Sequence, residues 1–430
     1  MPPLPLATQS RPADYAGERL LNYSYDPTQN VMLGRSGLSP VYTLAGTVRA
    51  LEEMGGRLYA VAGGYLWDVQ RERNLGFVGD DAKTTMAATA SYVVVVSSGR
   101  YYAYDGSALS SHSAGQVSVP VSVATIDGYV VVAGQDATRA DRIAVSNLDN
   151  PTAFDGLDFA TAETLPDGIV RVIRDHKELA AFGERTTERF YNSGEVFPFA
   201  PNPSAFAERG CANGATVAAA DNGIYWLGND GLVYRSFGGQ PEVVSTSVVS
   251  EWIARRSIEC GFSVEDRGRK FYVLRLSDGP SLAFNIGAGL WSEFSTGGTH
   301  EAWMGSAAYK MGGTQYIGTT TGKVCIFSGW TDDGMAIRAE AYSQPIREKV
   351  VRVNSIELQM DSGHGPALVN LQTSQDGRNW SMPRQRSLGQ TGHYGRAARW
   401  YGCGTSRNMF QARVWITGPV QRDIHGVYYG

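Results

Sequence analysis

Residues 223–239 read GIYWLGNDGLVYRSFGG, which combines a glycine-containing turn, a short apolar strand, a second turn and another strand. Six other segments between about residue 55 and residue 330 have the same pattern, and successive starts are 35 to 49 residues apart. A four-stranded propeller blade has about 40–45 residues. Because such repeats bury their apolar faces only by stacking on their neighbours, we expect the array to close into one ring. The seven segments start at Gly56, Ser91, Gly128, Lys177, Gly223, Gly268 and Gly313.

The chain therefore belongs to the all-β class, and we predict a β-propeller of about seven blades. Six blades is the main alternative, because a blade can lose strands or be completed by the N-terminal segment. Residues 351–430 contain six further alternating strands joined by glycine-containing turns, which is typical of a small β-sandwich. The predicted domains are an extended N-terminal arm (1–45), the propeller (46–340) and a C-terminal β-sandwich that serves for docking (341–430).

Two segments depart from the strand pattern. Residues 245–257, STSVVSEWIARRS, place Val248, Val249, Trp252 and Ile253 at helical spacing after Ser and Thr capping residues, so we expect a short helix there. Residues 331–349 are expected to form a segment that crosses from the propeller to the sandwich.

Charge is distributed unevenly. Of the 38 Lys and Arg residues, 11 lie in 341–430, against 5 of the 42 Asp and Glu residues, so this segment carries a net charge of +6 and the rest of the chain −10. Chance solvation of a surface explains such an asymmetry equally well. The functional alternative is that the C-terminal module docks an acidic partner or faces nucleic acid, with Arg as the interface cation. The candidate interface residues are Arg384, Arg386, Arg396 and Arg399.

Signals for catalysis, cofactors and metals are weak. The sequence has no phosphate-binding loop, HExxH, GxSxG or CxxC motif, and its six histidines stand singly along the chain. We therefore predict that the protein is not an enzyme and that it has no catalytic, cofactor-binding or metal-binding residue. The overall charge of −4, the absence of a long apolar stretch and the N-terminal residues predict no membrane segment and no secretory signal.

Residues 374–380, SQDGRNW, resemble a shortened Asp-box, the hairpin of sialidase-type propellers. Ser374 and Asp376 are expected to satisfy the backbone groups of a turn, Gly377 to adopt a positive φ, and Trp380 to pack beneath the turn. This hairpin is structural in those enzymes, and here it lies outside the repeats and lacks one residue and the Thr. We interpret it as a turn.

Longer stretches carry a more specific resemblance. The chain is similar to the tail nozzle proteins of short-tailed phages, which stabilise packaged DNA. One departure is visible, because SQDGRNWS is one residue shorter than the SDDGG-type turn of that family. The matching stretches are PLATQS (5–10), LDFATAETLPDGIV (157–170), FGERTTERFYNSG (182–194), ERGCA (208–212), WLGNDGLVYR (226–235), TDDG (331–334), MDSGHG (360–365), SQDGRNWS (374–381) and GQTGHYGRAARW (389–400).

The resemblance implies a structural protein of the virion tail, synthesised in the host cytoplasm. It implies a homohexameric ring attached below the portal adaptor, which extends the DNA channel, helps to retain the packaged genome and offers attachment points to needle or fibre proteins. Double-stranded DNA would pass through without sequence-specific binding. An acidic majority suits such a channel, because DNA phosphates gain affinity from Lys and Arg.

Two other functional classes remain open. A glycan-binding or glycan-cleaving propeller of the sialidase type would place carboxylates and aromatic side chains together at the mouth of the ring. A host-type interaction propeller of the WD40 kind would repeat Gly-His and Trp-Asp dipeptides. Here Trp67-Asp68 is the one Trp-Asp, and Gly-His occurs at Gly363-His364 and Gly392-His393, outside the repeats.

Overall fold

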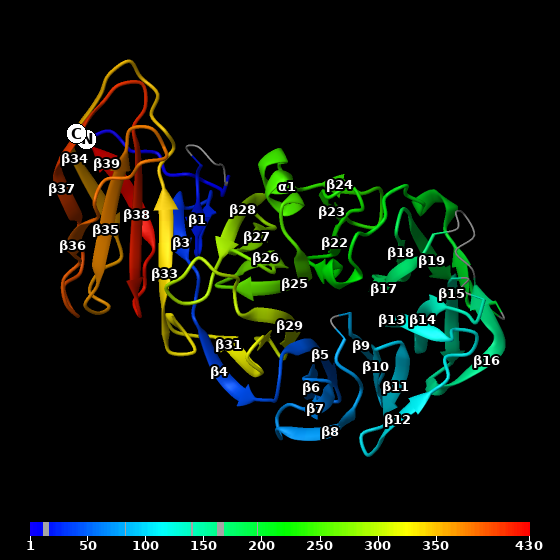
Figure 1. Ribbon diagram of the computed structural model, residues 1–430. Coiled ribbons are helices and arrows are strands. Elements are labelled where there is room, and N and C mark those ends of the chain that lie inside the picture. The colour runs from blue at the N-terminus through cyan, green and yellow to red at the C-terminus, as the bar shows by residue number, and fades with distance from the viewer. Residues whose placement is uncertain (12–16, 82, 139–140, 161–166, 196) are drawn as a thin grey trace.

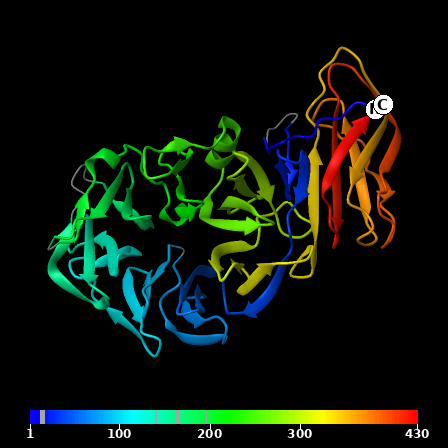
Figure 2. The ribbon, with the colours of Figure 1, turned by 180° about the vertical axis from the view of Figure 1, so that it is seen from behind.

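The computed structural model describes residues 1–11, 17–81, 83–138, 141–160, 167–195 and 197–430 of the 430-residue chain, with the backbone alone for 156–160. Within these ranges the chain forms 39 strands, one α-helix and two short 3-10 turns, η1 (Pro203–Ala205) and η2 (Gly214–Thr216). The strands make a ring of sheets with a second, smaller β-domain beside it (Figures 1 and 2).

Six antiparallel groups of four consecutive strands follow one another around the ring; five are separate sheets, and the sixth is part of a larger sheet. The first three are β5 (Val48–Met54), β6 (Arg57–Ala62), β7 (Tyr65–Asp68) and β8 (Arg73–Phe77); β9 (Thr85–Ala88), β10 (Val93–Ser97), β11 (Arg100–Tyr104) and β12 (Leu109–His112); and β13 (Val119–Ile126), β14 (Tyr129–Gln135), β15 (Asp141–Asn147) and β16 (Asn150–Ala160). The next three are β17 (Ile169–Asp175), β18 (Glu178–Gly183), β19 (Thr187–Asn192) and β20 (Phe199–Pro201); β21 (Ala218–Ala220), β22 (Gly223–Leu227), β23 (Val233–Ser236) and β24 (Glu242–Val243); and β25 (Ile258–Asp266), β26 (Arg269–Leu276), β27 (Ser281–Asn285) and β28 (Leu290–Phe294).

The seventh blade is assembled from both ends of the array. It contains β29 (Gly305–Met311), β30 (Thr314–Thr319) and β31 (Lys323–Phe327), and its fourth strand is β4 (Leu38–Thr43). β4 runs antiparallel to β31, with Phe327 opposite Leu38 and Lys323 opposite Thr43. The ring is thus closed by strand pairing between the N-terminal segment and the last repeat. The prediction of a seven-bladed propeller is confirmed.

Each contact between neighbouring blades has its own apolar cluster, and seven such clusters fill the seven contacts. Aromatic rings bridge several of them: the Phe182 and Trp226 centroids lie 5.0 Å apart between the fourth and fifth blades, and Tyr225 stacks on Tyr272 at 5.4 Å between the fifth and sixth. Because the apolar surface of a blade is covered only by its neighbours, the seven repeats depend on one another for stability.

The predicted short helix is present as α1 (Ser247–Ala254), between the fifth and sixth blades. The side chain of Thr246 accepts a hydrogen bond from the Val249 N–H and caps the first turn. Val249 and Ile253 are buried against the fifth and sixth blades, which fixes the helix on the ring.

The second domain is a β-sandwich, as predicted. Its core lies between the two sheets and includes Trp400, which has no exposed surface. One sheet has the order β33 (Met335–Tyr342), β38 (Gln411–Gly418), β35 (Leu368–Ser374) and β36 (Arg384–Ser387). The other has the order β2 (Tyr23–Asp26), β3 (Val31–Gly34), β39 (Ile424–Tyr429), β34 (Val351–Met360) and β37 (Ala398–Ser406).

All six strands expected within 351–430 are present, but the segment 331–349 is more than a crossing. It contains β32 (Thr331–Asp332) and the eight-residue strand β33, whose Ile337, Ala339 and Ala341 are completely buried. The N-terminal segment also contributes more than the strand that closes the ring, because β2 and β3 belong to the sandwich. The two-residue strand β1 (Leu20–Leu21) pairs with β28 of the propeller and with β33 of the sandwich, so one sheet continues across the two domains.

Candidate functional site: the arginine-rich edge of the sandwich

The predicted interface arginines lie where the open edges of the two sandwich sheets face each other. Arg384 and Arg386 lie on β36, the edge strand of one sheet, and Arg399 lies on β37, the edge strand of the other. Arg396 is in the loop just before β37. An exposed edge strand offers unpaired N–H and C=O groups that can pair with another chain, so proteins protect such edges with charged side chains. We call β36, β37 and the loop before β37 the arginine edge.

Arg384 and Arg386 join the two edge strands. The Arg386 Nε donates to the main-chain oxygen of Arg399 at 2.9 Å, and the Arg384 Nη1 donates to that of Gly402 at 3.3 Å. The Arg384 guanidinium also bonds the carbonyl of Tyr401, and in return the Trp400 indole N–H donates to the Arg384 carbonyl at 2.8 Å. These two arginines therefore satisfy carbonyls of β37, which gives them a structural role within the subunit.

Arg399 and Arg396 are more available to a partner. The Arg399 Nε is 2.6 Å from Glu357 Oε2 across the β34–β37 pair, yet 56% of its side chain is exposed. Hydrogen bonds from Gln359 and Arg399 hold the pKa of Glu357 below its ordinary value. Arg396 is exposed, and the hydrogen bond that fixes it is the one from its backbone N–H to Ser362 Oγ, at 3.0 Å. The structure thus brings Arg384, Arg386 and Arg399 together, with Arg396 in the adjoining loop.

Sequence reasoning missed the apolar residues on the arginine edge and directly before β36. Met382 is 84% exposed, Tyr394 69% and Tyr401 64%, although all three are large side chains. Arginine, tyrosine and methionine are enriched at protein interfaces. The signal for Tyr401 was present in the sequence, because Trp400 and Ala398 are buried and a strand alternates its faces, so Arg399 and Tyr401 must share the outward face.

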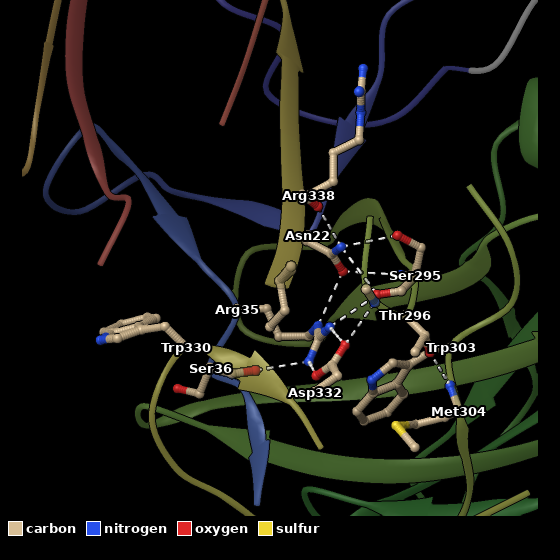
Figure 3. A network of polar contacts seen from close by, with 12 residues as sticks. Asn22, Arg35, Ser36, Ser295, Thr296, Trp303, Met304, Trp330, Asp332 and Arg338 are labelled. Carbon is tan, nitrogen blue, oxygen red and sulfur yellow. Dashed lines mark hydrogen bonds and ion pairs between the residues drawn. The ribbon is translucent and has the colours of Figure 1, made fainter. Parts of the chain in front are cut away.

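A buried polar junction fixes the position of the sandwich beside the propeller (Figure 3). Arg35, which precedes β4, donates to Asp332 Oδ1 at 2.9 Å and Oδ2 at 2.7 Å, and also to the carbonyls of Ser36 and Ser295. Its guanidinium lies 5.2 Å from the Trp303 ring centroid. Asn22 accepts from Arg35 Nε and donates to the carbonyls of Ser295 and Arg338, so it links the N-terminal segment, the sixth blade and β33.

A second group extends the junction toward the end of the chain. Arg267, from the turn between β25 and β26, binds Asp423 through two hydrogen bonds of 2.9 and 2.6 Å. Burial alone would raise the pKa of Asp423, but bonds from Arg267 and from the Gly34 N–H hold it below its ordinary value. Arg422 donates to the carbonyls of Ile337 and Trp330, and burial lowers its pKa to about 10. Both groups join residues that are far apart in the sequence, so no short sequence motif could have predicted them.

The Asp-box-like segment is a turn, as interpreted. Ser374 Oγ accepts from the Gly377 N–H at 2.9 Å, and Asp376 Oδ1 accepts from the N–H groups of Arg378 and Asn379 at 2.9 and 2.7 Å. Gly377 has φ 70°, and the Trp380 ring packs edge-on against Tyr342. These bonds lower the pKa of Asp376. The segment's polar groups are therefore used within the turn.

Potential catalytic groups are dispersed. Among the residues that the structure describes, no group of three or more His, Cys, Asp or Glu is placed to hold a metal ion. His300 lies 3.1 Å from Glu340, which also binds Arg338, and His425 lies 2.9 Å from Asp361. Over the same described ranges, no helix is long and apolar enough to cross a membrane.

Two family models match this chain in consecutive order. Residues 22–327 match the model described as "Bacteriophage P22 Gp10, beta-propeller", and residues 340–428 match "Bacteriophage P22 Gp10, beta-sandwich". Together they cover most of the chain, and they divide it between the same two architectures as the structure. None of the curated proteins matches it.

Several solved structures are similar to this chain at low identity. The computationally designed Ika8 protein has 11% identity and a TM-score of 0.42, covering 68% of this chain and 99% of its own. The Pan2 WD40 domain of Neurospora crassa has 7% identity and a TM-score of 0.43, covering 65% of this chain and 88% of its own. PorZ of Porphyromonas gingivalis has 12% identity and a TM-score of 0.40, covering 74% of this chain and 44% of its own. These identities are too low to bear on function.

Proposed function

This chain belongs to the bacteriophage P22 Gp10 family, the tail nozzle and DNA-stabilisation proteins of short-tailed phages, and on that basis we propose that it forms the nozzle of a phage tail. As a member of a phage tail protein family it has a structural role in the virion, where it assembles with other tail components. We propose three specific points: the protein forms the nozzle, it attaches below the portal adaptor, and it helps to retain packaged DNA. The order of the two matched domains along the chain is the observation that carries it.

In this proposal six copies form a ring, with the propeller as a rigid wall and the sandwich as the docking module. Two features of the wall suit the role. β4 covers the outer edge of β31, which completes the seventh blade and closes the ring. Residues 1–340 also carry a net charge of −10, which disfavours adhesion of DNA phosphates to a wall that they must pass.

The arginine edge is the proposed docking surface toward a neighbouring copy or the adaptor ring. Its net positive surroundings, together with the −10 charge of the remainder, give two copies of this chain complementary surfaces. Arg396 and Arg399 would supply the charges, and Tyr401 and Met382 the apolar contact. Arg384 and Arg386 would support this surface from within, because they hold the two strands together. Needle or fibre proteins would attach at the tip of the assembled ring.

The experiment that tests the proposal measures the mass of the purified chain in solution, alone and after mixing with a portal–adaptor complex. We expect a ring of six copies to form on the adaptor, visible as a stoichiometric increase in particle mass. A monomer that ignores the adaptor at micromolar concentration would overturn the nozzle assignment. Turnover of a sialoside or another glycan by the isolated chain would instead support the alternative of a glycan-processing propeller.

A further inference from the structure

The centre of the propeller is a narrow channel lined by the first strand of each blade. It encloses about 340 Å³ and is bordered at several levels by small side chains, among them Ala50, Ala87, Ala124 and Ala308. Larger apolar residues, among them Leu51, Met86 and Phe262, also border this space. The result is an internal space of the size that accommodates a small molecule or ion.

The wall of this channel has the opposite charge to the rest of the propeller. Its charged side chains are Arg49, Arg171, Arg174 and Glu52, which makes three cations and one acid. Burial raises the pKa of Glu52 to about 7, so this carboxyl is only partly ionised at neutral pH. An acidic domain with a net charge of −10 over residues 1–340 therefore has a cationic channel.

Two of the three arginines already have partners. The Arg49 Nε lies 2.6 Å from Asp80 Oδ1, and the Arg174 Nε donates to the His176 carbonyl at 2.9 Å while its side chain remains exposed. Arg171 differs from both. It lies on β17 directly after a register shift between Ile169 and Arg171, and bulges of this kind redirect the following side chain.

No carboxylate pairs with Arg171 among the residues that the structure describes, and its buried Nε has no hydrogen-bond acceptor. Burial lowers the pKa of the Arg171 guanidinium to about 10, so the group is still charged at neutral pH. The Arg171 residue is only partly exposed, and restricting the access of water to a charge without a partner is unfavourable, so proteins ordinarily supply a counter-ion or a ligand at such a place. A guanidinium presents its donors in a planar fork that fits the oxygens of a phosphate or a carboxylate.

We propose that the propeller channel binds a small oxyanion of the phosphate or carboxylate type at Arg171. Arg171 supplies the hydrogen-bonding fork, the small side chains of the neighbouring strands supply the space, and Glu52 weakens binding when it is ionised. This proposal concerns the isolated subunit and does not depend on assembly into a tail. The oxyanion site and the nozzle function can therefore be refuted independently.

The test is a calorimetric titration of the full chain with inorganic phosphate and, separately, with acetate at the same ionic strength. We expect saturable binding of one ion per chain. Comparing the affinities for phosphate and acetate shows whether the site prefers a tetrahedral or a planar oxyanion. The variant Arg171→Met, which keeps most of the side-chain volume, should weaken binding about tenfold or more, since charge-assisted hydrogen bonds to the anion are lost. Arg352→Met is the matched control: Arg352 is an exposed arginine on β34 of the sandwich, and its replacement should leave binding unchanged.

Thermal unfolding distinguishes a ligand site from a structural arginine. In buffer without oxyanions, Arg171→Met should unfold at the same or a higher temperature than the wild type, because a partly buried charge without a carboxylate partner has been removed. If Arg171→Met does not fold, the variant Glu52→Gln provides the test. It should bind the ion several-fold more tightly than the wild type at pH 8. Absence of saturable binding by the wild type, or equal affinities of the wild type and Arg171→Met, would overturn the proposal. If Arg171→Met does not fold, an affinity of Glu52→Gln for the ion equal to that of the wild type would also overturn the proposal.

Discussion

Arg35 and Asp332, 297 positions apart in the sequence, form an ion pair with two hydrogen bonds of 2.9 and 2.7 Å, and no more than 1% of either side chain is exposed. Arg35 precedes the strand that closes the propeller, and Asp332 lies in β32, which leads into the sandwich. The pair therefore stands where three parts of the fold meet: the N-terminal segment, the last blades and the first strand of the sandwich.

Replacing one partner of this pair should be strongly destabilising. We expect Asp332→Asn to lower the free energy of unfolding by about 3–5 kcal/mol, because Arg35 would remain buried without a full counter-charge. Chemical denaturation followed by tryptophan fluorescence measures the change. The double variant Arg35→Met/Asp332→Leu removes both charges and should be more stable than Asp332→Asn. A double variant that is less stable than the single one would show that the hydrogen bonds of Arg35 to Ser36 and Ser295 matter more than charge pairing.

Closure of the ring by β4 predicts that the N-terminal segment can act in trans. Deletion of residues 1–45 should remove β1, β2 and β3 as well as β4, which leaves the seventh blade without its outer strand and exposes the edge of β31, so we expect a lower melting temperature and concentration-dependent aggregation. A synthetic peptide of residues 1–45 should bind the truncated chain and restore part of the lost stability. The matched peptide with Leu38→Asp should fail, because Leu38 is completely buried between the sixth and seventh blades. Equal melting temperatures of the full and truncated chains would refute this role of β4.

Much of this architecture follows from local pattern. The seven repeated segments, with starts from Gly56 to Gly313, predicted the number of blades. The alternation of residues 351–360 likewise predicted β34, which has those bounds. The strand β33 was missed because its inward face includes Ala339 and Ala341, whose small side chains make alternation weak. The assignment of β2 and β3 to the sandwich was also missed, since β3 meets β39 through Met32 and Ile424, which are nearly 400 residues apart.

The candidate interface was only partly predictable. An excess of arginine in 341–430 drew attention to Arg384, Arg386 and Arg399, and the structure brings these three together. Composition did not reveal that Arg384 and Arg386 bond the carbonyls of the opposite edge strand, because that depends on which two sheet edges face each other. The unpaired Arg171 is likewise visible only once the seven first strands surround a common channel.

Acid should weaken the junction between the domains through Glu340. Burial favours the protonated form of this side chain, but hydrogen bonds from His300 and Arg338 prevail and lower its pKa to about 2, from an ordinary 4.5. The ionised form is thus stabilised in the folded state, and its contribution of about 3 kcal/mol is present above pH 4.5 and is lost as the pH falls toward 2. Unfolding free energies measured between pH 6 and pH 2 should therefore decrease less steeply in Glu340→Gln, although this variant is less stable at pH 6. Parallel pH profiles of the two proteins would contradict the assignment.

Charge reversal on the arginine edge should impair assembly without unfolding the subunit. Arg396 is exposed, with its backbone N–H alone fixed by Ser362, so Arg396→Glu introduces repulsion toward an acidic partner while the sandwich core is unaffected. Adding Arg399→Glu should weaken assembly further, although the new carboxylate would lie opposite that of Glu357 and repel it. The variant Arg399→Gln removes the cation without that repulsion. We expect at least a tenfold loss in the fraction of chains recovered in rings on the adaptor, measured by native mass spectrometry, with an unchanged melting temperature for Arg396→Glu. The matched control is Arg100→Glu, an identical charge change at an exposed position of the second blade, which should assemble normally. If the rings of Arg396→Glu and Arg100→Glu form equally well, the docking surface lies elsewhere on the molecule.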